Sequence, residues 1–109
     1  MTGALVIATS DAHVASLIQD NPLVALEFTA TWCGPCAVLL PVLTTLADDY
    51  PQVVVVKADE TVSFGHATSY QVMGFPTVLF FRDGEVVDRM VGAKPKGAVA
   101  KYFDALVSA

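Results

Sequence analysis

Two cysteines placed three positions apart are the residues of this chain best suited to do chemistry. They lie in the stretch TWCGPCAV (31–38), and the 109-residue sequence has no other cysteine. A pair of thiols at this spacing can act as a reversible dithiol and disulfide, supply half of a metal site, or close a structural loop. The residues around Cys33 and Cys36 decide among these uses.

A metal site and a structural disulfide both have little support in the sequence. A structural zinc ion usually takes four Cys or His ligands, and one CxxC pair supplies two of them. The only histidines, His13 and His66, fall on different predicted elements and lack the short spacing of a zinc finger. A disulfide that closes so short a loop removes little entropy from the unfolded chain, so it would stabilise the fold little. We therefore expect no bound metal.

The two residues between the sulfurs favour redox exchange. Gly34 allows a tight turn, and Pro35 stiffens the loop and suits the first turn of a helix. Cys33 then lies at the helix N-terminus, where free N–H groups and the helix dipole favour a thiolate. Cys36, one turn into the helix, is expected to be more buried and less readily ionised. We predict that Cys33 attacks a disulfide and that Cys36 resolves the product.

The elements that must position this pair follow from hydrophobic periodicity. Strands are predicted at 4–9, 23–29, 53–58, 77–81 and 85–91, and helices at 10–20, 35–50, 61–70 and 96–108. Val38 is among the side chains expected to face inward on the second helix. The turn signal Asp83-Gly84 joins the last two strands as a hairpin. The order βαβαβαββα predicts one α/β domain over residues 1–109, with a central mixed five-stranded sheet flanked by helices.

Composition and charge exclude several classes of partner. The formal net charge is −5 and the six Lys and Arg residues are scattered, so nucleic acid and anionic membranes would find no basic stripe. No apolar run approaches the roughly 20 residues that span a bilayer. The first residues lack the features of a signal peptide, so we expect a cytoplasmic protein, and a monomer. A reducing compartment favours a catalytic or metal-binding role for an isolated cysteine pair over a structural one.

Glu27 is the strongest candidate outside the cysteine pair. It alternates with Leu23 and Ala25 on one face of a strand whose other face is apolar. A carboxylate there should be buried, and burial raises its pKa. Its place just before the loop would put it beneath Cys36. The alternative is a glutamate at a strand end that reaches solvent.

Three motifs together resemble the thioredoxin family. FTATWCGPC is followed roughly forty residues later by GFPT, and then by a third motif, DGE…VGA, in the order found in that family. The resemblance runs from about residue 5 to the C-terminus. It implies a thioredoxin fold and a protein-disulfide reductase that uses a reversible Cys33–Cys36 disulfide. It also implies no bound cofactor, disulfide-containing substrate proteins as partners, and electrons from an NADPH-dependent thioredoxin reductase.

The resemblance assigns roles to Glu27 and Lys57. The family has a buried acid at this place, normally aspartate, which shuttles a proton to the resolving cysteine. We hypothesise that Glu27 deprotonates Cys36 while the reduced substrate is released. Lys57 matches a family lysine that pairs with the acid across neighbouring strands. The alternative is a lysine whose amine extends into solvent.

The resemblance also outlines a substrate-binding surface. Pro76 should be cis and lie against the sulfurs, while the backbone of Phe75 offers strand-like hydrogen bonds to an extended peptide. An apolar rim around Cys33 completes this surface. The substrate-binding residues expected are Trp32, Gly34, Pro35, Phe75, Pro76, Gly92 and Ala93.

Two departures from the family are expected to touch this rim. Ala37 replaces a common lysine, and Thr29 replaces a usual aromatic residue. Losing a positive charge near Cys33 should weaken thiolate stabilisation slightly and alter the choice of partner.

Two other functions compete with the reductase. One is a redox-independent binding or chaperone-type module that keeps the fold. The other is an oxidase or isomerase of an oxidising compartment, against which the Gly-Pro dipeptide and the expected location argue.

Overall fold

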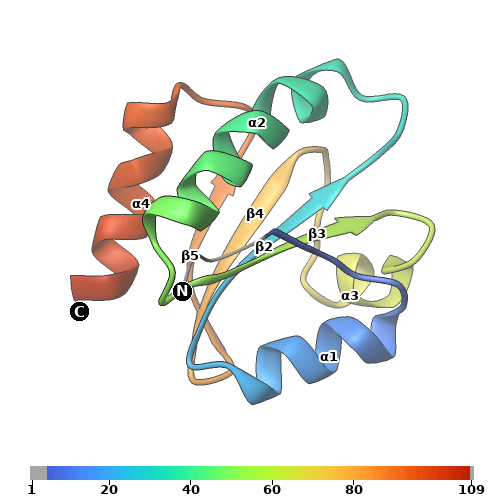
Figure 1. Ribbon diagram of the computed structural model, residues 1–109. Coiled ribbons are helices and arrows are strands. Elements are labelled where there is room, and N and C mark those ends of the chain that lie inside the picture. The colour runs from blue at the N-terminus through green and yellow to red at the C-terminus, as the bar shows by residue number, and fades with distance from the viewer. Residues whose placement is uncertain (1–4, 109) are drawn as a thin grey trace.

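The computed structural model describes residues 5–108, which form a five-stranded sheet between two helical layers. Helices α1 and α3 cover one face of the sheet, and α2 and α4 cover the other (Figure 1). In chain order, the elements are β1 Leu5–Ile7, α1 Asp11–Asp20, β2 Leu23–Thr29, α2 Gly34–Asp49, β3 Val54–Asp59, α3 Phe64–Ser69, β4 Thr77–Arg82, β5 Glu85–Val91 and α4 Lys96–Ser108. The predicted fold class and element order are confirmed.

The sheet is mixed, with the order β1-β3-β2-β4-β5. Strands β1, β3 and β2 run parallel, and β4 and β5 run antiparallel to their neighbours. The last two strands are joined through Asp83 and Gly84, which have φ of 51° and 84°. Positive φ at both positions is what a two-residue hairpin with the twist of its strands requires, so the predicted hairpin is confirmed.

Strand β2 lies inside the sheet and is buried on both faces from Val24 to Thr29. Because side chains alternate along a strand, Val24, Leu26 and Phe28 pack toward α1 and α3. Ala25 packs toward α2 and α4. Glu27 has the same parity as Ala25 and therefore faces the layer that contains α2.

Two sequence predictions about the helices are wrong. Val38 is 67% exposed, because the buried stripe of α2 follows a different phase, through Cys36, Leu39, Leu43, Leu46 and Ala47. Helix α3 begins at Phe64 rather than near Thr61. The Asp59 carboxylate accepts hydrogen bonds from the amide and hydroxyl of Thr61, and this local turn replaces the first helical turn.

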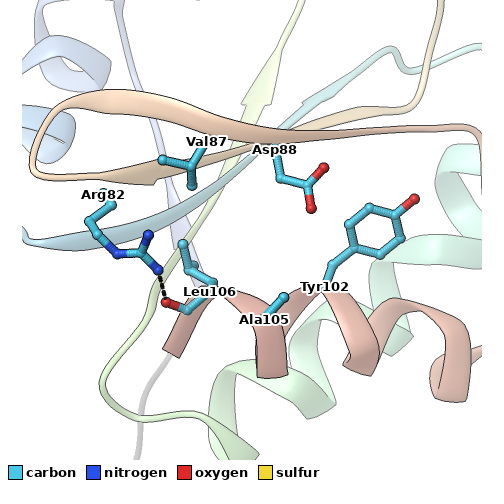
Figure 2. A pocket seen from close by; sticks show the side chains of 6 residues that line it. All are labelled: Arg82, Val87, Asp88, Tyr102, Ala105 and Leu106. Atoms are coloured by element: carbon cyan, nitrogen blue, oxygen red, sulfur yellow. Dashed lines mark hydrogen bonds between the residues drawn. The ribbon is translucent and has the colours of Figure 1, made fainter. Parts of the chain in front are cut away.

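A hydrogen bond from an arginine side chain connects the C-terminal helix to the sheet. Figure 2 shows Arg82 of β4 donating a hydrogen bond to the carbonyl of Leu106, near the end of α4. A cation is favourable there because the last carbonyls of a helix carry partial negative charge. The hollow around this contact, about 160 Å³, is lined by β4, β5 and α4 and contains no cysteine. Among the described residues, no helix is long and apolar enough to cross a membrane.

We expect Phe103→Ala to lower the free energy of unfolding by about 3–5 kcal/mol, because a fully buried ring leaves a cavity in the core under α4. The ring packs edge-on against Phe80 of β4. Urea denaturation measures the loss. Val87→Ala, at a half-exposed position on β5, should change stability by less than about 0.5 kcal/mol. Similar losses for both variants would contradict this packing.

Candidate active site

The cysteine pair sits at the N-terminus of α2, as the sequence predicted. Cys33 is the N-cap residue, and Pro35 lies in the first turn. Cys33 and Cys36 are joined as a disulfide, with their Cα atoms 5.3 Å apart. The amide of Cys36 donates a hydrogen bond to the Cys33 sulfur over 3.2 Å. Backbone N–H groups at this helix end can therefore stabilise negative charge on Cys33.

Cys33 is the slightly more exposed of the two cysteines, at 8% against 4% for Cys36. This order is the one that the sequence predicted. The Cys33 sulfur lies 3.5 Å from the carbonyl oxygen of Phe75, whose side chain packs on the small cluster around the cysteines. The backbone of Phe75 therefore lies directly beside the Cys33 sulfur.

The segment that contains Phe75 lies beside the end of β5. The Phe75–Pro76 peptide bond is cis, as the resemblance implied. The amide of Gly92 donates to the carbonyl of Pro76 over 2.8 Å. Gly92 has φ of 84°, a conformation that glycine adopts without strain. This contact brings together two parts of the expected rim that are distant in the sequence.

Trp32 is 70% exposed, yet it is held in place. Its indole Nε1 donates to a carboxylate oxygen of Glu60 over 2.9 Å, and its ring meets Phe75 edge-on at 5.9 Å between centroids. An exposed but ordered aromatic ring is typical of a docking surface. No local pattern marks Glu60 in the sequence, because its partner is 28 residues away.

The other residues of the expected rim lie at different depths. Gly34, Pro35 and Ala93 are exposed, Phe75 and Gly92 are half-buried, and Pro76 is buried. The predicted rim does not contain Met73, which is 93% exposed just before the GFPT motif. A single exposed methionine has no pattern that could have marked it.

Glu27 is 1% exposed, so the alternative of a glutamate that reaches solvent is wrong. Among residues 5–108, neither of its carboxylate oxygens has a hydrogen-bond partner. Burial raises the pKa of Glu27 to about 7, and the positive charge of Lys57 limits the rise. Lys57 is half-buried and lies opposite Glu27 in the register of β2 and β3. The two residues are neighbours without a direct hydrogen bond from the amine to the carboxylate.

A cavity of about 160 Å³ joins Glu27 to the cysteines. Its lining includes Glu27, Lys57, Thr29 and both cysteines. The cavity has polar groups in its lining and room for several water molecules, which makes it suited to connect the carboxylate with Cys36. Thr29 is 5% exposed and lies in this lining, so the expectation that it touches the rim is wrong. It has the same strand parity as Glu27 and points inward for that reason.

A family model and the curated relatives that match this chain agree with one another. The sequence model of the family described as Thioredoxin matches residues 4–105. A thioredoxin of Staphylococcus epidermidis is 38% identical over 100 residues, which cover 91% of this chain and 95% of that protein. Thioredoxin 2 of Chlorobaculum tepidum is 36% identical over 105 residues, which cover 95% of this chain and 96% of that protein.

Two solved structures are also similar. An N21Q mutant thioredoxin from Halobacterium salinarum NRC-1 superposes with a TM-score of 0.89 at 31% identity, covering 97% of this chain and 93% of that one. Oxidised mitochondrial thioredoxin 3 from Saccharomyces cerevisiae gives a TM-score of 0.85 at 33% identity, covering 94% and 95%.

We expect Glu27→Gln to change how stability depends on pH in the oxidised protein. The folded pKa of about 7 lies above the ordinary value of 4.5, so the folded state holds the proton more tightly than the unfolded state. The contribution of Glu27 to stability is then most favourable below about pH 4.5 and is lost as the pH rises to about 7. The loss is on the order of 3 kcal/mol, and the neutral amide avoids it.

Urea denaturation of both proteins across this pH range measures the difference between them. Glu85→Gln removes a carboxylate from an exposed position on β5 and serves as the matched control. A constant difference between the Glu27→Gln variant and the unsubstituted protein at all pH values would contradict the raised pKa.

Proposed function

The chain belongs to the thioredoxin family, and from this premise we propose that Cys33 and Cys36 divide the work of disulfide reduction between them. The chain is a thiol-disulfide reductase with a redox-active cysteine pair. The observation that carries the assignment of roles is the position of Cys33 at the helix N-terminus, next to the exposed rim. Cys36 lies one turn further into α2 and is nearly inaccessible.

The reaction proceeds by two exchanges of sulfur. The Cys33 thiolate attacks one sulfur of a substrate disulfide, so that a mixed disulfide forms and the other substrate sulfur leaves as a thiolate that takes up a proton. The Cys36 thiolate then attacks the Cys33 sulfur and releases the second substrate thiol. The substrate gains two electrons, and Cys33 and Cys36 become the disulfide.

Glu27 acts as the general base for the second exchange. Cys36 must lose a proton before it can attack, and a group that titrates near neutral pH is the most effective acceptor. A pKa of about 7 meets this requirement, and the cavity offers a path through water between the carboxylate and Cys36. Lys57 keeps the pKa of Glu27 from rising further.

Substrate proteins dock on the rim formed by Trp32, Gly34, Pro35, Phe75, Pro76, Gly92 and Ala93. An extended peptide pairs with the backbone of Phe75, while its disulfide sulfur meets Cys33. The short distance from the Cys33 sulfur to the Phe75 carbonyl supports this arrangement.

Members of the family are generally free of cofactors and receive electrons from thioredoxin reductase. The chain accordingly binds no cofactor, and an NADPH-dependent thioredoxin reductase returns the Cys33–Cys36 disulfide to the dithiol. The resemblance over most of the chain supports this assignment, as it supports a cytoplasmic monomer that forms one domain over residues 1–109.

The two cysteine variants test the roles in reduction. Cys33→Ser should lower the rate of reduction of a disulfide-bonded test protein such as insulin by several orders of magnitude, because the only thiol left, Cys36, is buried. Cys36→Ser should instead accumulate a mixed disulfide through Cys33, visible by mass spectrometry. A mixed disulfide through Cys36 in the Cys33→Ser variant would reverse the roles. A redox-independent binding module would keep its effect in both variants.

We expect Glu27→Gln to slow resolution of the mixed disulfide roughly a hundredfold at pH 7, because the general base is lost. The step near pH 7 in the pH–rate profile should disappear as well. Glu27→Asp, which keeps a carboxylate, is the control and should retain a step. An unchanged profile in Glu27→Gln would show that Glu27 has no part in proton transfer.

A further inference from the structure

Helix α3 leads directly into the rim. It spans only Phe64–Ser69, and residues 71–76 then run to the cis proline; we call residues 71–76 the docking segment. A helix this short is not stable by itself and depends on contacts with other elements. The groups that contact the two ends of α3 therefore help to determine the position of Phe75.

The N-terminal end of α3 is held by Asp11 of α1. Its carboxylate accepts hydrogen bonds from the amides of Gly65 and His66, each over 3.1 Å, and contacts His66 Nδ1 at 2.7 Å. Ser63, at the N-cap position, makes no side-chain cap. Bonds from His66 hold the pKa of Asp11 below its ordinary value, so the cap stays anionic, as a helix N-terminus favours.

The C-terminal end of α3 is held by Arg89 of β5. Arg89 lies opposite Leu79 in the β4–β5 register and so faces the layer of α1 and α3. Its guanidinium donates to the carbonyls of Tyr70 and Gln71. Gln71 has φ of 56°, the left-handed turn at which the chain leaves the helix for the docking segment.

We propose that Arg89 is a positioning residue for disulfide reduction, because it fixes the start of the docking segment to β5, the strand that Gly92 directly follows. The end of the segment is already tied to the same strand, through the Gly92 amide and the Pro76 carbonyl. Both ends of the docking segment are thus held by hydrogen bonds to β5 or to the residue that follows it. The part of the rim around Phe75 and the part around Gly92 therefore form one surface. The inference rests on the proposed docking of substrates at Phe75.

The expected consequence lies in substrate binding rather than in sulfur chemistry. If the segment moves, only a fraction of molecules present the complete rim, and the apparent affinity for a protein substrate falls by that fraction. A small disulfide reagent needs only the Cys33 sulfur and does not sense the rim.

The test is Arg89→Met, which keeps a long side chain at an exposed position but removes the guanidinium. KM for a protein disulfide should rise roughly tenfold, the lower end of the scale of one charge-assisted hydrogen bond, with kcat unchanged. The kcat/KM for 5,5′-dithiobis(2-nitrobenzoic acid) should not change. Arg89→Lys, which can still donate to one carbonyl, should recover part of the KM.

The matched control is Arg82→Met. Arg82 also donates to a carbonyl near a helix end, that of Leu106 in α4, and the substitution removes the same charge (Figure 2). Since α4 carries no part of the rim, KM should not change. An equal rise of KM in Arg82→Met would mean that charge, not placement, is responsible, and would overturn the proposal.

A variant in the rim itself separates the role of Arg89 from the docking surface on which that role depends. Ala93→Glu places a charge in the exposed rim and should raise KM for the protein substrate. A raised KM in Ala93→Glu with an unchanged KM in Arg89→Met overturns the role of Arg89 alone. An unchanged KM in both variants overturns the docking surface and the role of Arg89 together. A parallel loss with the protein and the small reagent in Arg89→Met also overturns the proposal.

Discussion

Strand β2 is buried on both faces, so each of its side chains must enter one of two packed layers. The alternation of the strand then sends Glu27 and Thr29 toward the layer of α2. The chain leaves the sheet directly afterwards, and Cys33 caps α2 within the next turn. A buried acid, a cavity beside it and a cysteine pair at a helix N-terminus are thus brought together by one strand and the turn that follows it.

The two departures from the family pattern on β2 meet in the same cavity. Glutamate is one methylene longer than the usual aspartate, and threonine is far smaller than the usual aromatic residue. Both Glu27 and Thr29 line the cavity of about 160 Å³, so the smaller side chain leaves room for the longer acid and for water beside it. A buried carboxylate without a hydrogen-bond partner opposes folding at neutral pH, and active sites are where such groups are retained.

The sequence was sufficient wherever a local pattern decides the outcome. Alternation in β2 predicted the burial of Glu27, and the Asp83-Gly84 turn predicted the hairpin. Applied one step further, the same alternation would have placed Thr29 in the interior; the resemblance alone misplaced it on the rim. The contacts of Arg89 with Tyr70 and of Asp11 with His66 join residues 19 and 55 positions apart, and they follow only from the complete fold.

The absence of a lysine at Ala37 affects the chemistry and the docking differently. The Cys33 sulfur accepts a hydrogen bond from the Cys36 amide, and the helix dipole acts at the same point. These fixed dipoles lie within bonding distance, so salt screens them less than it would screen an exposed lysine. The thiolate can therefore form without that charge. Ala37 is exposed, and a surface charge mainly steers the approach of a partner. The substitution should thus act on which proteins dock near Cys33 more than on the exchange of sulfur that follows.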